Sequence, residues 1–380
     1  MRAQDLALQR DKYKHLSNVE WRWMLQQVEG RERTADKLPT FAAMEEWWYP
    51  VRLSCEQCSS EETARYKGQM VNGKCPNGKC LDLTGGYGVD TFFLSEGFEH
   101  TDYVEQNEEL CRIAAHNFAG KPIIIHNATA EAFLQTAGQY DLIYLDPARR
   151  DSHGGKVFRL EDCTPNVVDL LPELIAHLTP NGRILQKLSP MLDLTQAVKT
   201  LDAVAWDVQV VAIKNEVKEV LLLSGGTGQI TAVDLAKKEQ AFVFTREEEQ
   251  NCPMVNGKCD NGQWLYEPNA AILKAGAYKL VGQRFGLQKL DVNTHLYASD
   301  KLVSDFPGRI WRIKDEGLKG EKMEGGKANV ICRNYPLPPE ALKKKLHLHD
   351  GGTDYIIGCR VAGKPTLFLA ERVEDIHRES

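Results

Sequence analysis

The sequence lacks three features that would each point to a distinct class of protein. No apolar run reaches the roughly 18 residues that a transmembrane helix needs. The opening stretch, MRAQDLALQRDKYKH, carries charges where a secretory signal would need its apolar region. Basic residues are in deficit, 47 against 53 acidic ones, and the net charge of −6 argues against a wholly basic nucleic-acid binder. We therefore expect a cytoplasmic protein with no membrane partner.

Ten cysteines are present, and in the cytoplasm we expect reduced thiols rather than disulfides. Two cysteine pairs, Cys55 with Cys58 and Cys75 with Cys80, would suffice in number for a tetrahedral zinc site. The second pair overlaps a repeat, however, because the letters MVNGKC that end at Cys75 recur at 254–259 without a full cysteine quartet nearby. Two inserted loops with incidental thiols are the simpler interpretation, and we expect no metal.

The middle of the chain alternates short β-rich apolar runs with amphipathic helical segments. This alternation predicts an α/β fold, a doubly wound and Rossmann-like sheet of seven strands. The last two strands are too close in sequence for a crossover helix, so the seventh is predicted to be antiparallel to its neighbour. The predicted strands are 80–83, 102–105, 122–126, 141–146, 183–188, 208–213 and 219–223, and the helices between them are 90–95, 108–118, 130–135, 165–177 and 194–201.

The flanking parts of the chain have other patterns. Apolar residues at helical spacing predict an N-terminal helical region, and the segment after the glycine-rich stretch 223–229 predicts small α+β domains with helices at 270–282 and 339–346. Within 310–349, nine basic residues against five acidic ones give +4, which suits a phosphate backbone but equally fits a solvated face. The predicted regions are 1–67, 68–228, 229–308 and 309–380.

The strongest chemical signal is LDLTGGYGVD at Leu81–Asp90, directly after an apolar strand and before a helix. Gly86 and Gly88 would let the backbone turn tightly and approach a ligand, and the helix start favours an anionic group. Glu105 ends the next strand, where a carboxylate can accept hydrogen bonds from both ribose hydroxyls of a nucleoside. The competing interpretation is a turn whose glycines serve packing alone.

A second signal is YDLIYLDPARR at Tyr140–Arg150, an apolar strand that ends in Asp146 and Pro147. A carboxylate held by a rigid turn beside a cofactor can orient an amine-bearing nucleophile, and catalysis is then largely positioning. Arg149 and Arg150 open a basic loop, which suggests phosphate contacts at the mouth of the site or a merely solvated loop.

These two motifs resemble motif I and motif IV of class I S-adenosylmethionine-dependent methyltransferases. The acid precedes the glycines, unlike the G-x-G-x-x-G order of dinucleotide folds, and Thr84 stands where the first glycine is often found. In place of the aspartate that most relatives carry after the third strand, this chain has Asn127, whose amide could still contact the adenine edge. The resemblance implies S-adenosylmethionine as cofactor, bound by Asp82, Thr84, Gly85, Gly86, Gly88, Glu105, Asn127 and Ala128.

Asp-Pro-Ala-Arg is similar to motif IV of RNA methyltransferases, which implies catalytic roles for Asp146, Pro147 and Arg149. Uracil-5 methyltransferases share these letters but need a cysteine after the fifth strand, where QKLSPM at 186–191 has none. Motif I is also similar to that of a ribosomal guanine-N2 methyltransferase, so a base nitrogen is a candidate target.

The resemblance extends along nearly the whole chain to a bacterial methyltransferase family with a ferredoxin-like domain and a THUMP-like C-terminal domain. Its motifs include KLP at 37–39, LSCEQCSSE at 53–61, FPGR at 306–309 and ANVICRNYP at 328–336. Region 68–228 would then be the methyltransferase domain, 229–308 the ferredoxin-like domain and 309–380 the basic, THUMP-like domain. Substrate contacts are expected at Arg150, Lys187, Lys343 and Lys344.

The leading hypothesis is an S-adenosylmethionine-dependent methyltransferase acting on a base of rRNA or tRNA, with RNA as its partner. A non-catalytic RNA-binding or ribosome-assembly factor that keeps the fold is the alternative from another class. Methylation of a protein or small molecule stays open, whereas the glycine pattern disfavours a nicotinamide-dependent oxidoreductase.

Overall fold

The chain folds into two compact units, one made of 1–208 with 218–227 and the other of 209–217 with 228–380. Among the residues that the structure describes, no helix is long and apolar enough to cross a membrane. The structure is a computed structural model that describes residues 3–71, 77–148, 160–236, 241–316 and 326–373.

The N-terminal region is helical, as predicted. Its longest helix begins after Ser17, which forms a capping box with Glu20. Another helix follows Ser59, and near its start the Ser60 hydroxyl accepts a hydrogen bond from the Thr63 backbone N–H at 3.3 Å. The helices of this region are α1 (Ala3–Ala7), α2 (Asn18–Thr34), α3 (Pro39–Ala43), α4 (Arg52–Gln57) and α5 (Glu61–Val71), with a 3₁₀ turn at Arg10–Tyr13.

The strands of the first unit follow the order β3-β2-β1-β4-β5-β7. Strands β1 to β5 are parallel to their neighbours, and β7 pairs antiparallel with β5, which confirms the predicted direction of the seventh strand. The division between the units crosses β6 and β7, so a count of seven strands in one domain is not confirmed. The strands are β1 (Lys79–Asp82), β2 (His100–Glu105), β3 (Ile123–Asn127), β4 (Tyr140–Leu145), β5 (Leu178–Leu188), β6 (Trp206–Ile213) and β7 (Glu216–Ser224).

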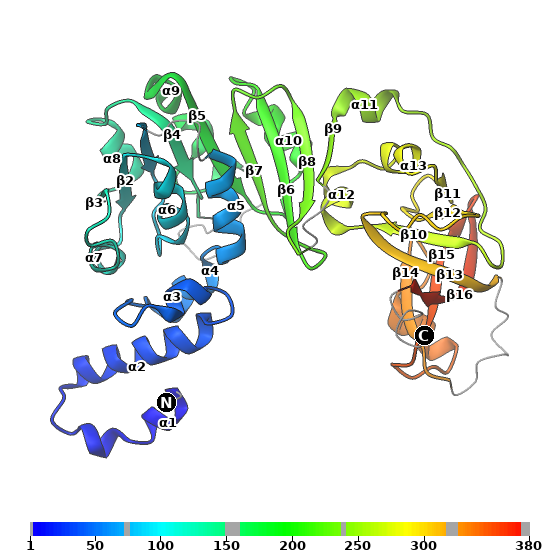
Figure 1. Ribbon diagram of the computed structural model, residues 1–380, viewed down its shortest axis with the longest axis horizontal. Coiled ribbons are helices and arrows are strands. Elements are labelled where there is room, and N and C mark those ends of the chain that lie inside the picture. Colours follow the sequence, from blue (N-terminus) through cyan, green and yellow to red (C-terminus); the bar gives the residue numbers. More distant parts are fainter. Residues whose placement is uncertain (1–2, 72–76, 149–159, 237–240, 317–325, 374–380) are drawn as a thin grey trace. The chain divides into compact units, whose positions relative to one another are not determined.

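Helices alternate with these strands along the chain (Figure 1), and each lies within two residues of its predicted ends. Side-chain caps fix the starts: the Asn107 carboxamide accepts from the Leu110 N–H at 3.2 Å, and Asn166 caps a helix predicted to begin at Pro165. The helices are α6 (Val89–Leu94), α7 (Glu108–Asn117), α8 (Ala130–Leu134), α9 (Val167–Ala176) and α10 (Leu194–Thr200), with 3₁₀ turns at Ser95–Gly97 and Leu160–Asp162.

An aromatic core joins the N-terminal region to the α/β part of the first unit. Phe41 and Trp47 stack with ring centroids 4.1 Å apart, and both pack against Phe92 of α6. The Trp47 indole N–H donates to the Tyr87 hydroxyl at 2.8 Å. Because Tyr87 belongs to the glycine-rich turn, its contacts with Trp47 and Phe41 attach the turn to this core.

The repeat differs from its prediction in one copy. Both copies are predicted to be loops, but Met70 and Val71 form the last residues of α5. The rest of that copy, including Cys75, lies outside the described residues. The second copy, at 254–259, contains no helix or strand, as predicted. Helix α5 continues into the repeat because Val71 is buried and so extends its apolar face.

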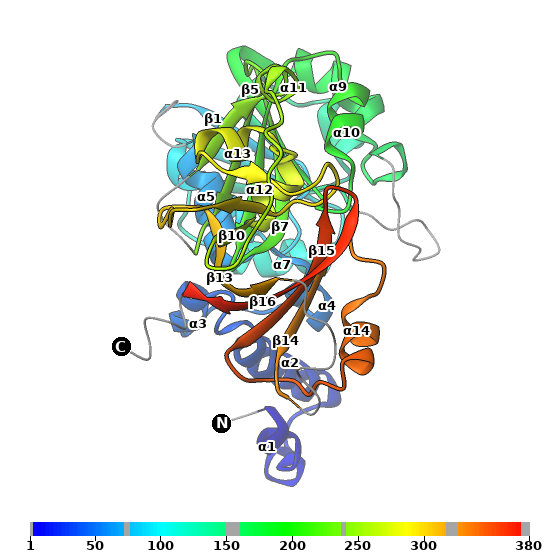
Figure 2. The ribbon, with the colours of Figure 1, turned by 90° about the vertical axis from the view of Figure 1, so that its right-hand side faces the viewer.

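The second unit contains a seven-stranded sheet of order β11-β12-β10-β13-β16-β15-β14. It also contains β8 and β9, which pair antiparallel with each other and follow β6 in the strand order of the other sheet. Helix α14 packs against β14 (Figure 2). Its elements are β8 (Gln229–Asp234), β9 (Phe242–Thr245), α11 (Arg246–Asn251), β10 (Trp264–Pro268), α12 (Ala270–Ala275), α13 (Leu280–Arg284), β11 (Gln288–Lys289), β12 (Tyr297–Ser299), β13 (Gly308–Glu316), β14 (Asn329–Arg333), α14 (Pro339–Lys345), β15 (Asp354–Val361) and β16 (Lys364–Arg372).

The single helix predicted at 270–282 is wrong. Helix α12 ends at Gly276, which adopts a left-handed conformation with φ of 84°, and α13 begins four residues later. The predicted helix at 339–346 is confirmed as α14.

Candidate active site

The glycine-rich turn lies between β1 and α6 and is closed against β2. The Gly85 N–H donates to the Val104 carbonyl at 2.9 Å, and the Tyr103 hydroxyl donates to the Gly86 carbonyl at 2.5 Å. Gly86 and Gly88 have φ of 56° and 82°, which side chains rarely adopt. A Cβ atom at Gly85 would overlap the Tyr103 ring. Glycine is therefore required at positions 86 and 88 by the backbone conformation and at position 85 by packing against Tyr103.

Glu105 is aimed at this turn from the end of β2. Its Oε2 accepts from the Gly86 N–H at 2.9 Å, and its Oε1 accepts from the Asn107 N–H at 2.8 Å. An ionised carboxylate has about four acceptor positions, so two remain for a ligand once these N–H groups are bound. The predicted pairing of the turn with the acid of the second strand is present.

Asp82 lies beneath the turn, 1% exposed, and organises it from inside. Its Oδ1 accepts from the Thr84 N–H at 2.9 Å, and its Oδ2 from the Thr91 hydroxyl at 2.5 Å. Burial outweighs these hydrogen bonds and raises the pKa of Asp82 from 3.8 to about 7. In this structure Asp82 therefore supports the glycine-rich turn rather than presenting its carboxylate at the surface.

Thr84 connects the turn to the second motif. Its hydroxyl oxygen accepts a hydrogen bond from the Asp146 backbone N–H at 2.6 Å. A glycine at position 84 would leave that N–H without this partner, so the departure from the common motif has a local reason. The turn after β1 and the end of β4 are thereby brought together.

Asn127 ends β3 and bonds to the segment after β2. Its Nδ2 donates to the carbonyls of Glu105 and Gln106 at 3.0 and 3.1 Å, and contacts the Cys111 Sγ at 3.5 Å. The Ala128 N–H donates to the Glu105 carbonyl at 3.2 Å. The predicted adenine-side residues therefore adjoin the predicted ribose-binding acid.

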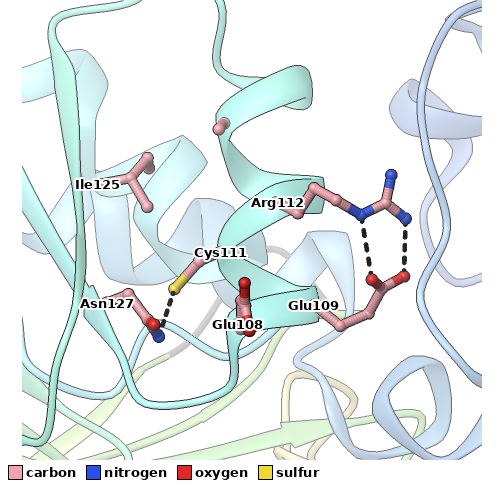
Figure 3. Close-up of a pocket in the computed structure, with 7 residues that line it drawn as sticks. Glu108, Glu109, Cys111, Arg112, Ile125 and Asn127 are labelled. Atoms are coloured by element: carbon pink, nitrogen blue, oxygen red, sulfur yellow. Dashed lines mark hydrogen bonds and ion pairs between the residues drawn. The ribbon is translucent and has the colours of Figure 1, made fainter.

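An open groove of about 590 Å³ lies along α7 and β3 (Figure 3). Asn127 and Cys111 face each other on one side of it, and Arg112 and Glu109 form a double contact on the other, the shorter at 2.8 Å. None of the turn glycines lines the groove, which adjoins the candidate site through Asn127 and through Cys111, whose Sγ donates to the Glu105 carbonyl at 3.1 Å.

Asp146 ends β4 with its side chain 37% exposed, next to the buried Pro147. The Oδ2 atom of Asp146 lies 2.6 Å from the Lys187 ammonium, so the lysine predicted to contact substrate is paired with the predicted catalytic carboxylate. Arg149 and Arg150 lie outside the described residues.

Behind this pair lies a buried set of charges that the sequence did not reveal. The Lys67 ammonium, fully buried on α5, is 2.7 Å from both carboxylate oxygens of Glu219 and 3.1 Å from Asp90 Oδ1. Asp90 Oδ2 accepts from the hydroxyls of Ser59 and Tyr144, each at 2.7 Å. Burial raises the pKa of Asp90, but Lys67 and Lys187 outweigh it, so the pKa lies below its ordinary value.

The two lysines predicted to contact substrate in the second unit lie on α14. The Lys343 ammonium is 2.7 Å from Asp350 and 3.1 Å from Glu340, whereas Lys344 is exposed. The FPGR arginine is also engaged, because Arg309 pairs with buried Glu267 at 2.6 Å.

The α/β fold, the glycine-rich turn and the carboxylates at the strand ends are those expected of a class I methyltransferase. Family models match a ferredoxin-like domain at residues 264–307 and a THUMP-like domain at 308–372. A crystal structure from Porphyromonas gingivalis W83, provisionally designated a methyltransferase, is 31% identical, covers 94% of this chain and 92% of that one, and superposes with a TM-score of 0.82.

A protein of Mycobacterium tuberculosis (strain CDC 1551 / Oshkosh), named an uncharacterised S-adenosylmethionine-dependent methyltransferase, is 22% identical over 346 residues. These cover 86% of this chain and 89% of that protein. Together with the P. gingivalis structure, this likeness shows that the chain belongs to the bacterial methyltransferase family with ferredoxin-like and THUMP-like domains.

Proposed function

We propose that this protein is an S-adenosylmethionine-dependent methyltransferase whose substrate is a base of rRNA or tRNA. The observation that carries the proposal is the pairing of Glu105 with the Gly86 N–H beside Asp146, whose own N–H is bound by Thr84. The bond between Thr84 and the Asp146 N–H joins the end of β4 to the turn that Glu105 contacts, which supports a single site for cofactor and substrate. The family relationship supports the same cofactor.

The residues present fit S-adenosylmethionine. Gly85 packs against the Tyr103 ring, with which a Cβ would overlap, whereas a Cβ at Gly86 would meet only the Thr84 carbonyl oxygen, at 3.7 Å. The turn is therefore open at Gly86, where a ligand can approach the backbone. Glu105 keeps acceptor positions for ribose hydroxyls, and Asn127 lies beside it for the adenine edge. When bound, the cofactor supplies an activated methyl group as its sulfonium.

The chain's own part in the reaction is orientation of the nucleophile. Asp146 accepts a hydrogen bond from an N–H of the target nitrogen. This bond orients the nitrogen so that the nitrogen's own lone pair faces the methyl carbon. Pro147 makes the backbone after Asp146 rigid. The basic residues that follow, Arg149 and Arg150, would contact RNA phosphates.

RNA as substrate rests on the THUMP-like match and on the base-methylating character of the DPAR motif. Exposed lysines such as Lys344 and Lys345 on α14 supply positive charge on that part of the chain. A phosphate backbone is the ligand that such charges bind with little sequence preference.

The test has two stages. Isothermal calorimetry should give saturable S-adenosylmethionine binding, and purified protein should transfer tritiated methyl groups from it to total RNA of a strain that lacks the gene. Mass spectrometry of nucleosides from that strain, with and without the complementing gene, then identifies the product. Binding of RNA without any methyl transfer would favour the non-catalytic alternative, and no cofactor binding would contradict the proposal.

A further inference from the structure

The catalytic carboxylate proposed above is held from two sides. Thr84 binds the Asp146 backbone N–H, and the Lys187 ammonium binds its Oδ2 at 2.6 Å. Lys187 is largely buried, with its side chain 13% exposed. One carboxylate oxygen is thereby occupied, and within the described part of the chain no hydrogen bond or ion pair engages Oδ1.

Lys187 is itself held by the N-terminal region. Its ammonium lies 3.1 Å from the Ser59 hydroxyl oxygen, and Ser59 is only 6% exposed. The same oxygen lies 3.3 Å from the Lys67 ammonium, while its proton is donated to Asp90 Oδ2 at 2.7 Å. One hydroxyl therefore contacts both lysines and Asp90, and it comes from outside the predicted methyltransferase domain.

The electrostatics keep this arrangement charged. Burial lowers the pKa of Lys187, but Asp146, Asp90 and Glu219 outweigh it and raise the pKa above its ordinary value. Lys187 is thus an ammonium donor at any physiological pH, so its contact with Asp146 is a charge-assisted hydrogen bond. Such a contact fixes the orientation of a carboxylate better than a neutral one does.

Resting on the proposed function, we infer that Lys187 and Ser59 are positioning residues, which hold Asp146 so that Oδ1 faces the target N–H. The segment after α4 is on this view a part of the active site rather than an appendage to it. Lys67 and Glu219 form a buried ion pair, and the Lys67 ammonium of this pair contacts the Ser59 hydroxyl.

The size of the effect follows from how sharply transfer depends on orientation. A misplacement of about 1 Å can cost about 100-fold in rate, so Lys187→Ala should lower kcat about 100-fold. Ser59→Ala removes the hydroxyl that contacts Lys187, Lys67 and Asp90 but leaves the Lys187–Asp146 pair, so it should lower kcat about tenfold. Both variants should keep the affinity for S-adenosylmethionine within about threefold, because neither residue contacts the turn glycines or Glu105.

The experiment measures kcat, KM for total RNA of the gene-deletion strain, and calorimetric Kd for S-adenosylmethionine in the full chain. Ser95→Ala is the matched control, because Ser95 is 5% exposed and its hydroxyl donates only to the Phe92 carbonyl one turn back, at 2.9 Å. It should leave kcat unchanged. Ethylammonium chloride should restore at least about tenfold of the kcat lost in Lys187→Ala, because the small cation can enter the space and pair with Asp146.

Three results would overturn the inference: unchanged kcat in Lys187→Ala and Ser59→Ala, a loss of cofactor affinity as large as the loss of kcat, or no recovery with ethylammonium. If the wild type is active and both variants keep its kcat, this inference is wrong but the proposed function stands. A wild type that methylates no RNA removes the proposed function, and the inference falls with it.

Discussion

Positive charges are used differently in the two units of this molecule. In the first unit, Lys67 and Lys187 are buried, and each contacts carboxylates and the shared Ser59 hydroxyl. In the second unit, Lys314 is 41% exposed and pairs with Asp354. Lys343 is largely covered, but its partners Glu340 and Asp350 are 78% and 79% exposed. Buried pairs leave an uncompensated charge when one partner is removed, whereas solvent replaces a surface partner that is removed.

The pairing in the second unit also corrects the charge count made from the sequence. The sum of +4 over 310–349 omits acids from outside that window, yet Lys314 pairs with Asp354 and Glu371, and Arg333 pairs with Glu267. Lys314 and Arg333 are therefore neutralised by acids outside the window. A count of charges in a window predicts a binding face only when the partners also lie in the window.

The largest expected effect concerns the carboxylate at the end of β4. Asp146→Ala should lower methyl transfer by about a thousandfold or more, because it removes the acceptor that orients the nucleophile. S-adenosylmethionine affinity should change little, since the turn and Glu105 remain. Single-turnover transfer and calorimetry measure the two quantities. Full activity with wild-type affinity would contradict the assignment of Asp146.

The second prediction concerns the buried ion pair of Lys67 and Glu219 and its contribution to the free energy of unfolding. Lys67→Met leaves Glu219 and Asp90 without their ammonium and should lower the free energy of unfolding by about 3–5 kcal/mol. Lys343→Met is the comparison, because its partners Glu340 and Asp350 are 78% and 79% exposed and solvent can replace the lysine. Its stability should stay close to that of the wild type. Denaturant unfolding compares them. Equal losses of stability would show that burial does not separate the two units.

A third change tests the packing of the glycine-rich turn. Gly85→Ala places a methyl group against the Tyr103 ring and should cost about 1–3 kcal/mol, with weaker cofactor binding. Gly138→Ala is the control, because a Cβ there meets nothing within 4 Å and φ is not positive. Should both variants unfold at the wild-type denaturant concentration, the close approach of turn and β2 would be wrong.

The fourth prediction concerns pH. The pKa of Asp82 is about 7 in the folded chain against 3.8 ordinarily, so the folded state binds the proton more tightly. Stability from this group is therefore greatest below about pH 4 and declines as pH rises to about 7. Asp82→Asn should flatten the dependence of unfolding free energy on pH in that window. If the pH dependence of the unfolding free energy is the same in Asp82→Asn as in the wild type, groups other than Asp82 cause it.

The strands and helices around the candidate site were predictable because their patterns are local. β1 to β7 and α6 to α10 have apolar runs of distinct period, and the motif acids follow directly at strand ends. Strand β13 was missed, because its letters GRIWRIKDE mix charges with apolar residues. The break at Gly276 was also missed, since a glycine near the end of a helical pattern can be tolerated or can cap it.

The buried charges could not be predicted from one sequence. Lys67 and Glu219 are 152 residues apart, and a lysine on an amphipathic helix is ordinarily solvated. A weak signal was available in Glu219, a carboxylate at the start of the apolar run Val220–Leu223. Thr84 was recognised only as a substitute for glycine, because its bond to the Asp146 N–H requires the adjacent ends of β1 and β4.

The smallest expected effect sharpens the comparison from the second unit. Lys344 and Lys345 on α14 are exposed, whereas Lys343 beside them is paired with Asp350. The double change Lys344→Gln with Lys345→Gln should lower the salt slope of log K by about 1.4–1.8, about 0.7–0.9 for each RNA phosphate that the variant no longer neutralises. Binding of total RNA should therefore weaken about tenfold more at about 50 mM salt than at about 200 mM. Lys343→Gln should change the slope less, because its charge is already compensated. Filter binding between about 50 and 200 mM salt measures both. If both variants keep the wild-type slope, RNA does not bind this helix, and the basic residues that follow Asp146 become the main phosphate contacts.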